Sequence, residues 1–298
     1  MNTIKALIER HPLLSYFALT FAITWGVFVL TVGPGGIPAT KEEFTTLPVG
    51  AILAVLLGPS VSGFLLTGLV YGREGYRVLL IRMRRWRVGA RWYAVALLTA
   101  PLVFTAVLIP LWLISPVFRL GIFASDAKAS FVLMGIVVAL VVGIFEELGW
   151  TGFAVPTLLK LRYGVLSTGL IVGVLWGAWH LLSNGIWASV ATSGGFPLAL
   201  FVILSGLSLL VGQLLAFRVL MVWVYERTGS LLLAILMHAS FAASTFILNP
   251  VAGPGAMSGS SLLTFDLVLA AAMWIVVGVV AVAQGGHLSR QSPRSRLA

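Results

Sequence analysis

The chain has 298 residues, of which 59% are hydrophobic and only 9% are charged. Soluble domains average about 25% charged residues, so this composition excludes an ordinary soluble protein and predicts a membrane protein. Cysteine is absent, which excludes disulfides, thiolate metal sites and cysteine nucleophiles. The net charge of +10 does not favour a nucleic-acid partner, because Lys and Arg mark the cytoplasmic loops of membrane proteins.

Eight apolar runs are long enough to cross a bilayer, since a helical span needs about 20 residues. We therefore predict an all-α, polytopic membrane helix bundle without a soluble domain. The first run follows Lys5 and Arg10 and has no small-residue cleavage site, which favours a retained helix over a signal peptide. The predicted spans are residues 13–33, 48–71, 93–115, 129–159, 164–183, 197–224, 229–248 and 262–284.

The basic residues predict the topology. If the N-terminus lies inside, 16 of the 19 Lys and Arg residues fall in inside segments, so both termini are expected in the cytoplasm. We expect a multi-pass protein of a bacterial cytoplasmic membrane. The inside residues are Lys5, Arg10, Arg73, Arg77, Arg82, Arg84, Arg85, Arg87, Arg91, Lys160, Arg162, Arg218, Arg227, Arg290, Arg294 and Arg296, and the outside residues are Lys41, Arg119 and Lys128.

Three parts are predicted along the chain. Residues 1–128 form a three-helix segment whose basic loop, 72–92, mixes arginine with aromatic and aliphatic residues, a pattern typical of an interfacial amphipathic helix on anionic lipid. Residues 129–248 form the core that carries the chemistry. Residues 249–298 form the last span and a basic tail that we predict to be disordered.

Glu146 and Glu147 lie side by side within the otherwise apolar fourth run. A single carboxylate at bilayer depth costs about 2.5–3.5 kcal/mol on insertion scales, so a functional site is the default hypothesis for the pair.

Of the four histidines, His180 and His238 lie within predicted spans, whereas His11 and His287 flank the outermost spans and are assigned no chemistry. A lone membrane histidine more often bonds a neighbouring helix than catalyses a reaction. Runs four and five are expected to turn near Arg162. At a rise of about 1.5 Å per residue, Glu146 and His180 are then level within one turn, and His238 lies slightly nearer the inner edge. Gly152 and Pro156 are expected to bend the fourth run.

Two carboxylates and two imidazoles in one layer suit hydrolysis by an activated water. A buried carboxylate and a nearby imidazole can deprotonate water, and a second imidazole can hold the oxyanion. The same groups, Glu146, His180 and His238, also suit a divalent metal such as zinc. No serine has a convincing base, since Ser60 lacks a matched partner, and Asp266 has no partner aspartate within a span.

Three motifs resemble those of the CAAX-processing and bacteriocin-processing (CPBP or ABI) intramembrane endopeptidases. Glu146-Glu147-Leu-Gly-Trp-Thr resembles the family pattern Glu-Glu-x-x-x-Arg. Trp176-Gly-Ala-Trp-His180 resembles Phe-x-x-x-His, and His238-Ala-Ser-Phe-Ala242 resembles His-x-x-x-Asn. The resemblance covers residues 130–248. It implies a CAAX prenyl protease 2-like endopeptidase that cleaves a membrane-tethered or lipidated peptide in the lipid bilayer, whether glutamate- or metal-dependent.

The resemblance also implies a role for each matching residue. Glu146 activates the water with His180 as its partner, His238 holds the oxyanion, and Glu147 supports the site. Two positions depart from the pattern: Thr151 stands at the family arginine, and Ala242 stands at the family asparagine. Trp176 for Phe is read as a mild change. Substitute hydroxyls are available from Ser240, Ser244 and Thr245, the last on the face of His238.

Two alternatives to an active peptidase stay open. Because Thr151 and Ala242 remove polar groups, the chain is also consistent with an impaired family member that serves as an immunity or partner-binding protein. A proton-coupled transporter is the third hypothesis, since intramembrane Glu and His occur in proton relays, although no inverted repeat is visible.

Overall fold

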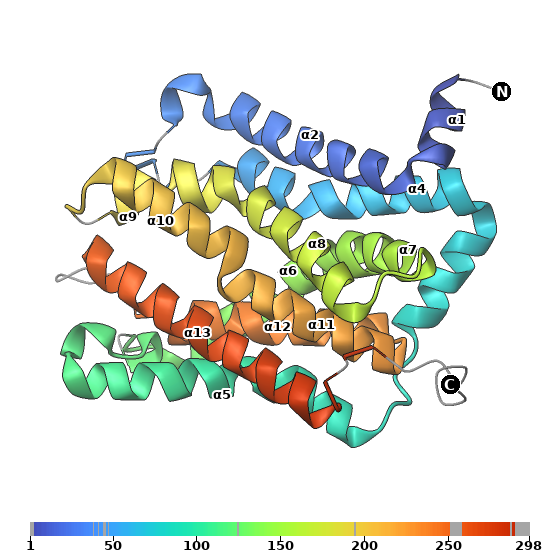
Figure 1. Cartoon of the computed structure of the whole chain (residues 1–298). Helices are drawn as coiled ribbons and strands as arrows, with labels where there is room; N and C mark the ends of the chain where they lie inside the picture. Colours follow the sequence, from blue (N-terminus) through green and yellow to red (C-terminus); the bar gives the residue numbers. More distant parts are fainter. Residues whose placement is uncertain are drawn as a thin grey trace.

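The computed structural model describes residues 3–37, 39–40, 42–43, 46, 48–123, 125–193, 195–250, 258–286 and 288–289, and these are helical with no strand among them (Figure 1). The prediction of an all-α bundle is confirmed. The helices are α1 Thr3–Arg10, α2 Pro12–Val32, α4 Val49–Met83, α5 Ala90–Ile114, α6 Lys128–Gly149, α7 Val155–Lys160, α8 Val165–His180, α9 Ser189–Thr192, α10 Leu198–Val211, α11 Gln213–Thr228, α12 Leu231–Leu248 and α13 Gly259–Ala283.

The described residues contain eight segments long and apolar enough to cross a membrane, as predicted. They run Pro12–Val32, Val49–Met83, Ala90–Ile114, Lys128–Lys160, Val165–Trp187, Leu198–Thr228, Leu231–Leu248 and Gly259–Ala283. Each predicted span overlaps one of them. The predicted tail after Gly285, with His287, lies almost entirely outside the described residues.

Three of the long segments are broken, and each break has a local cause. Gly72 interrupts α4 with φ 60°, a left-handed conformation that glycine tolerates, so residues 73–83 form a separate helical stretch beyond it. Gly212 separates α10 from α11. A π-helical segment, Trp150–Ala154, separates α6 from α7 at the bend expected near Gly152 and Pro156. Single-turn π segments are frequent at functional sites.

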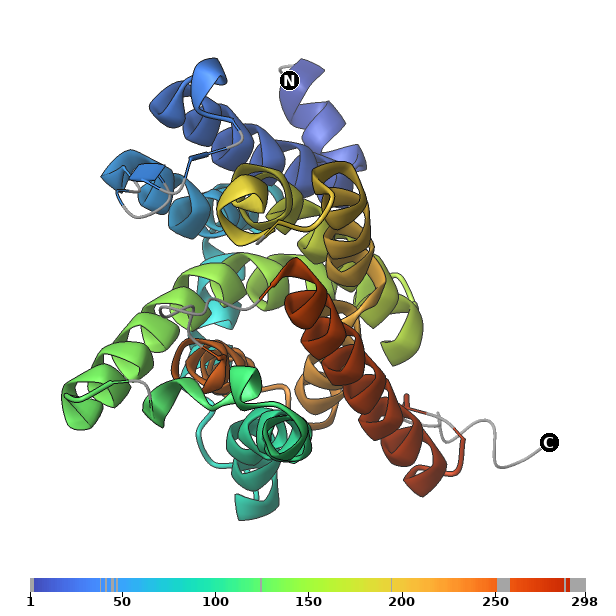
Figure 2. The ribbon, with the colours of Figure 1, turned by 90° about the vertical axis from the view of Figure 1, so that its left-hand side faces the viewer.

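The helix α6 runs from the edge of the bundle, where many of its side chains are exposed, to the interior, where its C-terminal end with the two glutamates is buried (Figure 2). It packs against α4 on one side and α12 on the other, while α8 packs against α11. Small residues allow these close crossings. A Cβ added to Gly149 would lie 2.2 Å from the Pro59 carbonyl oxygen, and one added to Gly143 would lie 2.8 Å from the Ile235 carbonyl oxygen. Close approach through small residues is how membrane helices gain van der Waals contact without a hydrophobic driving force.

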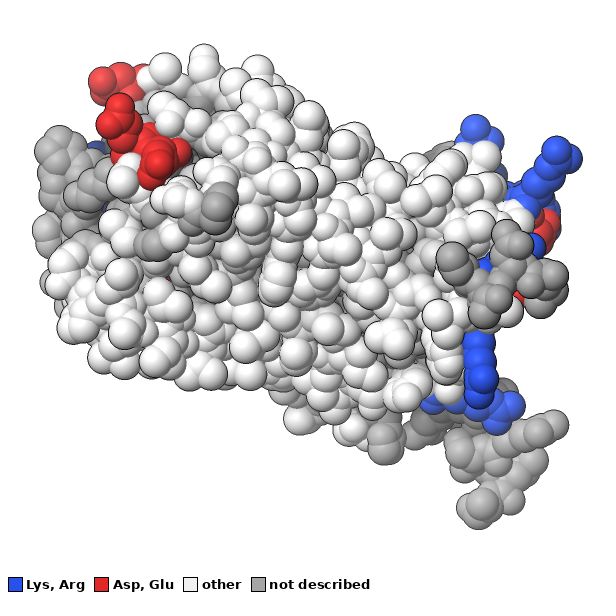
Figure 3. Space-filling view, turned by 90° about the horizontal axis from the view of Figure 1, so that it is seen from above, with Lys and Arg blue, Asp and Glu red and all other residues white. Residues whose placement is uncertain are grey.

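On the face of the molecule in Figure 3, the charged side chains lie at the two ends, and the band between them is almost free of charge. Arginine and lysine dominate the end at which α4 finishes and α5 starts. The uncharged band matches the hydrocarbon layer that eight apolar segments require. The direction in which this bundle crosses the membrane stays a prediction.

Candidate active site

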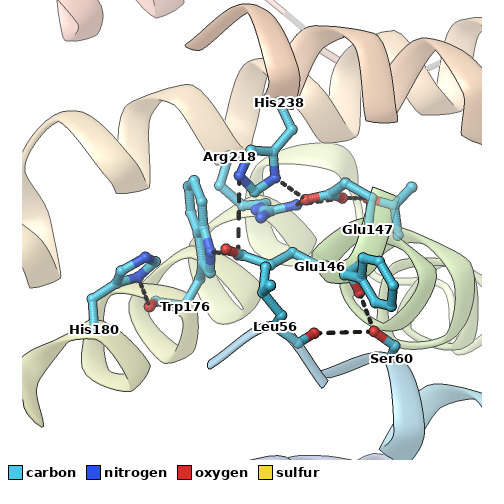
Figure 4. A network of polar contacts seen from close by, with 10 residues as sticks. Leu56, Ser60, Glu146, Glu147, Trp176, His180, Arg218 and His238 are labelled. Carbon is cyan, nitrogen blue, oxygen red and sulfur yellow. Dashed lines mark hydrogen bonds and ion pairs between the residues drawn. The ribbon is translucent and has the colours of Figure 1, made fainter. Parts of the chain in front are cut away.

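The carboxylates of Glu146 and Glu147 lie in the interior of the bundle, close to the C-terminal end of α6. Glu146 is 3% exposed and Glu147 is fully buried. A buried charge is tolerated only when it is paired and hydrogen-bonded, so the partners of each carboxylate define the site. Figure 4 shows these partners, which come from the neighbouring helices α8, α11 and α12 and from the π-helical segment.

Glu147 is surrounded by donors. Nη1 of Arg218 lies 2.9 Å from its Oε1 and 2.8 Å from its Oε2. Nδ1 of His238 lies 2.7 Å from Oε1, and the Thr151 hydroxyl donates to Oε2. Glu147 is thus committed to holding other groups in place, and it has little capacity left to accept a proton from a water.

Glu146 has far fewer partners. The indole Nε1–H of Trp176 donates to its Oε2 at 2.7 Å, and Nε2 of His238 lies 4.0 Å from the same oxygen. The hydrogen bonds among the described residues leave its Oε1 without a partner. Glu146 therefore keeps the free lone pairs that a general base needs.

His238 lies between the two carboxylates. Because a carboxylate only accepts, Nδ1 carries a proton that it donates to Glu147, and this orients Nε2 towards Glu146. The separation of 4.0 Å is too long for a hydrogen bond, and it is short enough for one bridging water to be within hydrogen-bond distance of both atoms. The ring also packs edge-on against Trp176, with centroids 5.2 Å apart.

His180 and Glu146 lie on opposite sides of the Trp176 indole (Figure 4). Nδ1 of His180 donates to the Trp176 carbonyl oxygen at 2.9 Å, which leaves Nε2 available. Its ring packs edge-on against Trp179, with centroids 4.6 Å apart. In the described part of the chain no hydrogen bond or ion pair joins His180 to a glutamate. Glu146, Glu147 and His238 thus form one network, with His180 one helical turn beyond it.

The main-chain frame of the glutamates is held by α4. The Ser60 hydroxyl donates to the Phe145 carbonyl oxygen at 2.6 Å and lies 3.2 Å from the Leu56 carbonyl oxygen (Figure 4). The Ser60 hydroxyl thus ties α4 to the residue that precedes Glu146. Pro59 and Gly149 make the close crossing at the same level.

Arg218 is the site residue that the sequence reasoning missed. It was counted among the cytoplasmic charges, but its side chain is 0% exposed and pairs with Glu147. Its guanidinium carbon also lies 4.1 Å from the centroid of the Trp176 ring. The expectation that Thr151 deprives the carboxylates of a cationic partner is therefore wrong: the arginine reaches them from α11, and Thr151 adds a hydroxyl donor.

Two further expectations change. The Trp176 side chain is not a mild replacement for phenylalanine, because its N–H is the hydrogen-bond donor to Glu146.

The three hydroxyls proposed to replace the missing asparagine are all directed at main-chain carbonyls. Ser240 donates to Leu97, Ser244 to Ser240, and Thr245 to Phe241. None of these three hydroxyls is therefore free to replace the family asparagine.

The fit of a metal ion can be judged from the side chains. Among the described residues there is no group of three or more His, Asp or Glu side chains arranged to hold one. Around Glu147 the guanidinium of Arg218 occupies the position next to the carboxylate that a cation would take. These residues as arranged do not fit a metal.

The family comparison adds an independent observation. Residues 128–244 match a family model described as type II CAAX prenyl endopeptidase Rce1-like. The match confirms the resemblance to the CAAX-processing intramembrane proteases. The matched segment contains all three motif regions, from Glu146 through His180 to His238. No curated protein matches the chain. The family model, the eight apolar segments and the buried polar network together support a multi-pass membrane protease of the CAAX type.

Proposed function

We propose that the protein hydrolyses a peptide bond of a membrane-tethered or lipidated peptide, using a water that Glu146 activates inside the membrane. The observation that carries this proposal is the contrast in partners between the two glutamates. Glu147 accepts from Arg218, His238 and Thr151, whereas Glu146 keeps one oxygen free beside the gap to His238.

In the proposed first step, a water in that gap attacks the carbonyl carbon of the scissile bond. Its proton passes to the free oxygen of Glu146 as the new C–O bond forms. Negative charge develops on the carbonyl oxygen, and a protonated Nε2 of His238 donates a hydrogen bond to it. The buried position of the site strengthens this interaction, because the local dielectric is low.

In the second step the tetrahedral intermediate collapses and the C–N bond breaks. The proton held by Glu146 passes to the leaving nitrogen, so the products are a new carboxyl terminus and a free amine. Glu147 acts as a positioning residue in this scheme. It fixes the orientation of His238 and stabilises its doubly protonated ring, as a buried carboxylate stabilises the imidazolium in other hydrolases.

The proposed partnership of His180 with Glu146 needs one movement. The Trp176 indole stands between the two side chains, so they can meet only if the indole turns aside. We propose that a bound peptide displaces it and that Nε2 of His180 then helps to orient the attacking water.

The test uses purified protein in proteoliposomes with a farnesylated peptide that carries a fluorophore and a quencher. Glu146→Gln is expected to lower the cleavage rate by about 10²–10⁴, the usual contribution of a general base. Glu74→Gln is the matched control, because Glu74 lies on the surface, paired with Arg77. Undiminished cleavage by Glu146→Gln would overturn the assignment.

Two other outcomes would favour the alternatives. If the wild type cleaves neither farnesylated nor unmodified membrane-tethered peptides, while Glu146→Gln retains the cellular phenotype of the wild type, the impaired-member hypothesis is favoured. Its structural motive is Ala242, for which none of the three α12 hydroxyls is free to substitute. Uptake into liposomes driven by a pH gradient would favour the transporter.

A further inference from the structure

A cavity lies at the basic end of the bundle, away from the glutamates. Its volume is about 360 Å³, and it is enclosed by the start of α5, the last turns of α11 and the end of α13. That volume falls within the range of small-molecule sites. The residues that line it are Arg91, Trp92, Val95, Trp223, Arg227 and Gln284.

The charges around this cavity favour an anion. Arg91 is exposed, and its guanidinium carbon lies 5.3 Å from the centroid of Trp92. Arg227 is partly neutralised, since its Nε lies 3.6 Å from a Glu226 oxygen, and its Nη2 donates to Gln284 at 2.8 Å. One carboxylate against two guanidiniums leaves the cavity positive.

The backbone favours an anion too. The helix α5 begins after Gly89, which supplies no side-chain cap, and its first turn contains no acidic residue. The Trp92 N–H donates to the Gly89 carbonyl oxygen at 2.9 Å, so the first N–H groups of this 25-residue helix, those of Ala90 and Arg91, and the positive end of its dipole are what it presents beside the cavity. Phosphate groups bind where such an end meets basic side chains.

The aromatic residues favour a lipid over a soluble anion. The rings of Trp92 and Trp223 meet edge-on, with centroids 5.1 Å apart, and Val95 continues the wall towards the apolar band. Tryptophan is enriched where a membrane meets water, because its ring suits both phases. A molecule with an anionic head and an apolar tail would match the two parts of this wall.

We infer that this cavity binds the phosphate headgroup of an anionic phospholipid at the inner membrane surface. Arg91 and Arg227 contact the phosphate, and the two indoles cover the glycerol region. Basic pockets between membrane helices on the cytoplasmic side are typical sites for anionic headgroups. The site is separate from the proposed hydrolytic centre and does not depend on it.

The test measures phospholipid retained by the purified full-length protein in native mass spectrometry, with phosphatidylglycerol and phosphatidylcholine of the same chain length. Phosphatidylglycerol should be retained in preference. Arg91→Gln should weaken its retention about fivefold, the effect of losing about 1 kcal/mol for one arginine near the surface. Arg91→Lys should keep most of it. Arg84→Gln is the matched control, because Arg84 is exposed on the same loop but does not line the cavity.

Excess inorganic phosphate distinguishes the two sources of the anion. If it leaves phosphatidylglycerol bound, the lipid is the ligand. If it displaces the lipid from the wild type and binds in an Arg91-dependent way, the site takes phosphate but draws it from solution, which overturns the lipid assignment. Equal retention of both lipids, or equal retention by Arg91→Gln and Arg84→Gln, overturns the site itself.

Discussion

The two neighbouring glutamates of α6 have opposite surroundings. On the Glu147 side, a buried guanidinium, an imidazole and a hydroxyl converge on one carboxylate. On the Glu146 side there is one indole N–H and a gap of 4.0 Å to the imidazole. A carboxylate whose oxygens are all hydrogen-bonded can hold neighbouring groups in place, whereas one with a free oxygen can accept a proton. The arrangement therefore divides positioning and proton transfer between adjacent residues of one helix.

The difference between the two sides predicts the largest effect on stability at Arg218. Arg218→Ala leaves Glu147 buried and without its cation, and breaking a buried ion pair in this way costs about 3–5 kcal/mol. Thermal unfolding of the protein in detergent micelles measures the loss. Lys5→Ala is the control, since Lys5 pairs with Glu9 at the surface, and such pairs contribute about 0–1 kcal/mol.

A rescue variant tests whether the stability of the protein depends on having an arginine beside Glu147 or on having it on α11. Thr151→Arg combined with Arg218→Ala moves the arginine to the family position, four residues after Glu147 and thus on the same face. We expect the double variant to be more stable than Arg218→Ala alone. A double variant as unstable as the single one would show that only α11 can deliver the cation.

The second prediction concerns the Glu146 side, where donors are few. Ala242→Asn restores the family donor one turn after His238 and should raise kcat/KM about 10²-fold, the lower end of the contribution of an oxyanion donor. Ala243→Asn is the control, because Ala243 lines an apolar groove between α5, α6 and α12. If Ala242→Asn folds and gains no more than Ala243→Asn, the oxyanion is held without that position.

Much of the fold follows from the sequence because membrane insertion is a local property. A run of about 20 apolar residues predicts a span whatever surrounds it. The turn near Arg162 is also local: Arg162 has φ 66°, and α8 begins three residues later. Depth arithmetic placed Glu146 level with His180 and His238 slightly nearer the inner edge, so it predicted one layer from the turn positions and the rise per residue alone, but not which histidine would contact which glutamate.

Arg218 escaped the sequence reasoning because it was assigned to a loop by charge alone. The same arithmetic, applied to Arg218, finds it. It lies nine residues before Arg227, about 14 Å above the inner edge, within one turn of the level expected for His238. The role of Trp176 could not be found in this way. The orientation of an indole depends on how α8 packs against its neighbours, and the sequence near Trp176 does not determine that packing.

Trp176 carries the smallest predicted effect, and its replacement tests the surroundings of Glu146, where hydrogen-bond donors are few. Trp176→Phe keeps an aromatic ring over Arg218 and beside His238 but removes the N–H that, among the described residues, donates to the Glu146 carboxylate. The expected loss of stability is about 1.5 kcal/mol, the lower end for a hydrogen bond to a charged group, because the freed oxygen can turn towards water. Because the indole N–H positions Glu146, the loss of this hydrogen bond should lower kcat and leave KM nearly constant in the farnesylated-peptide assay. Trp86→Phe, at an exposed position on the basic loop, should change neither quantity. A Trp176→Phe variant with wild-type stability and kcat would mean that Glu146 does not depend on this bond for its position.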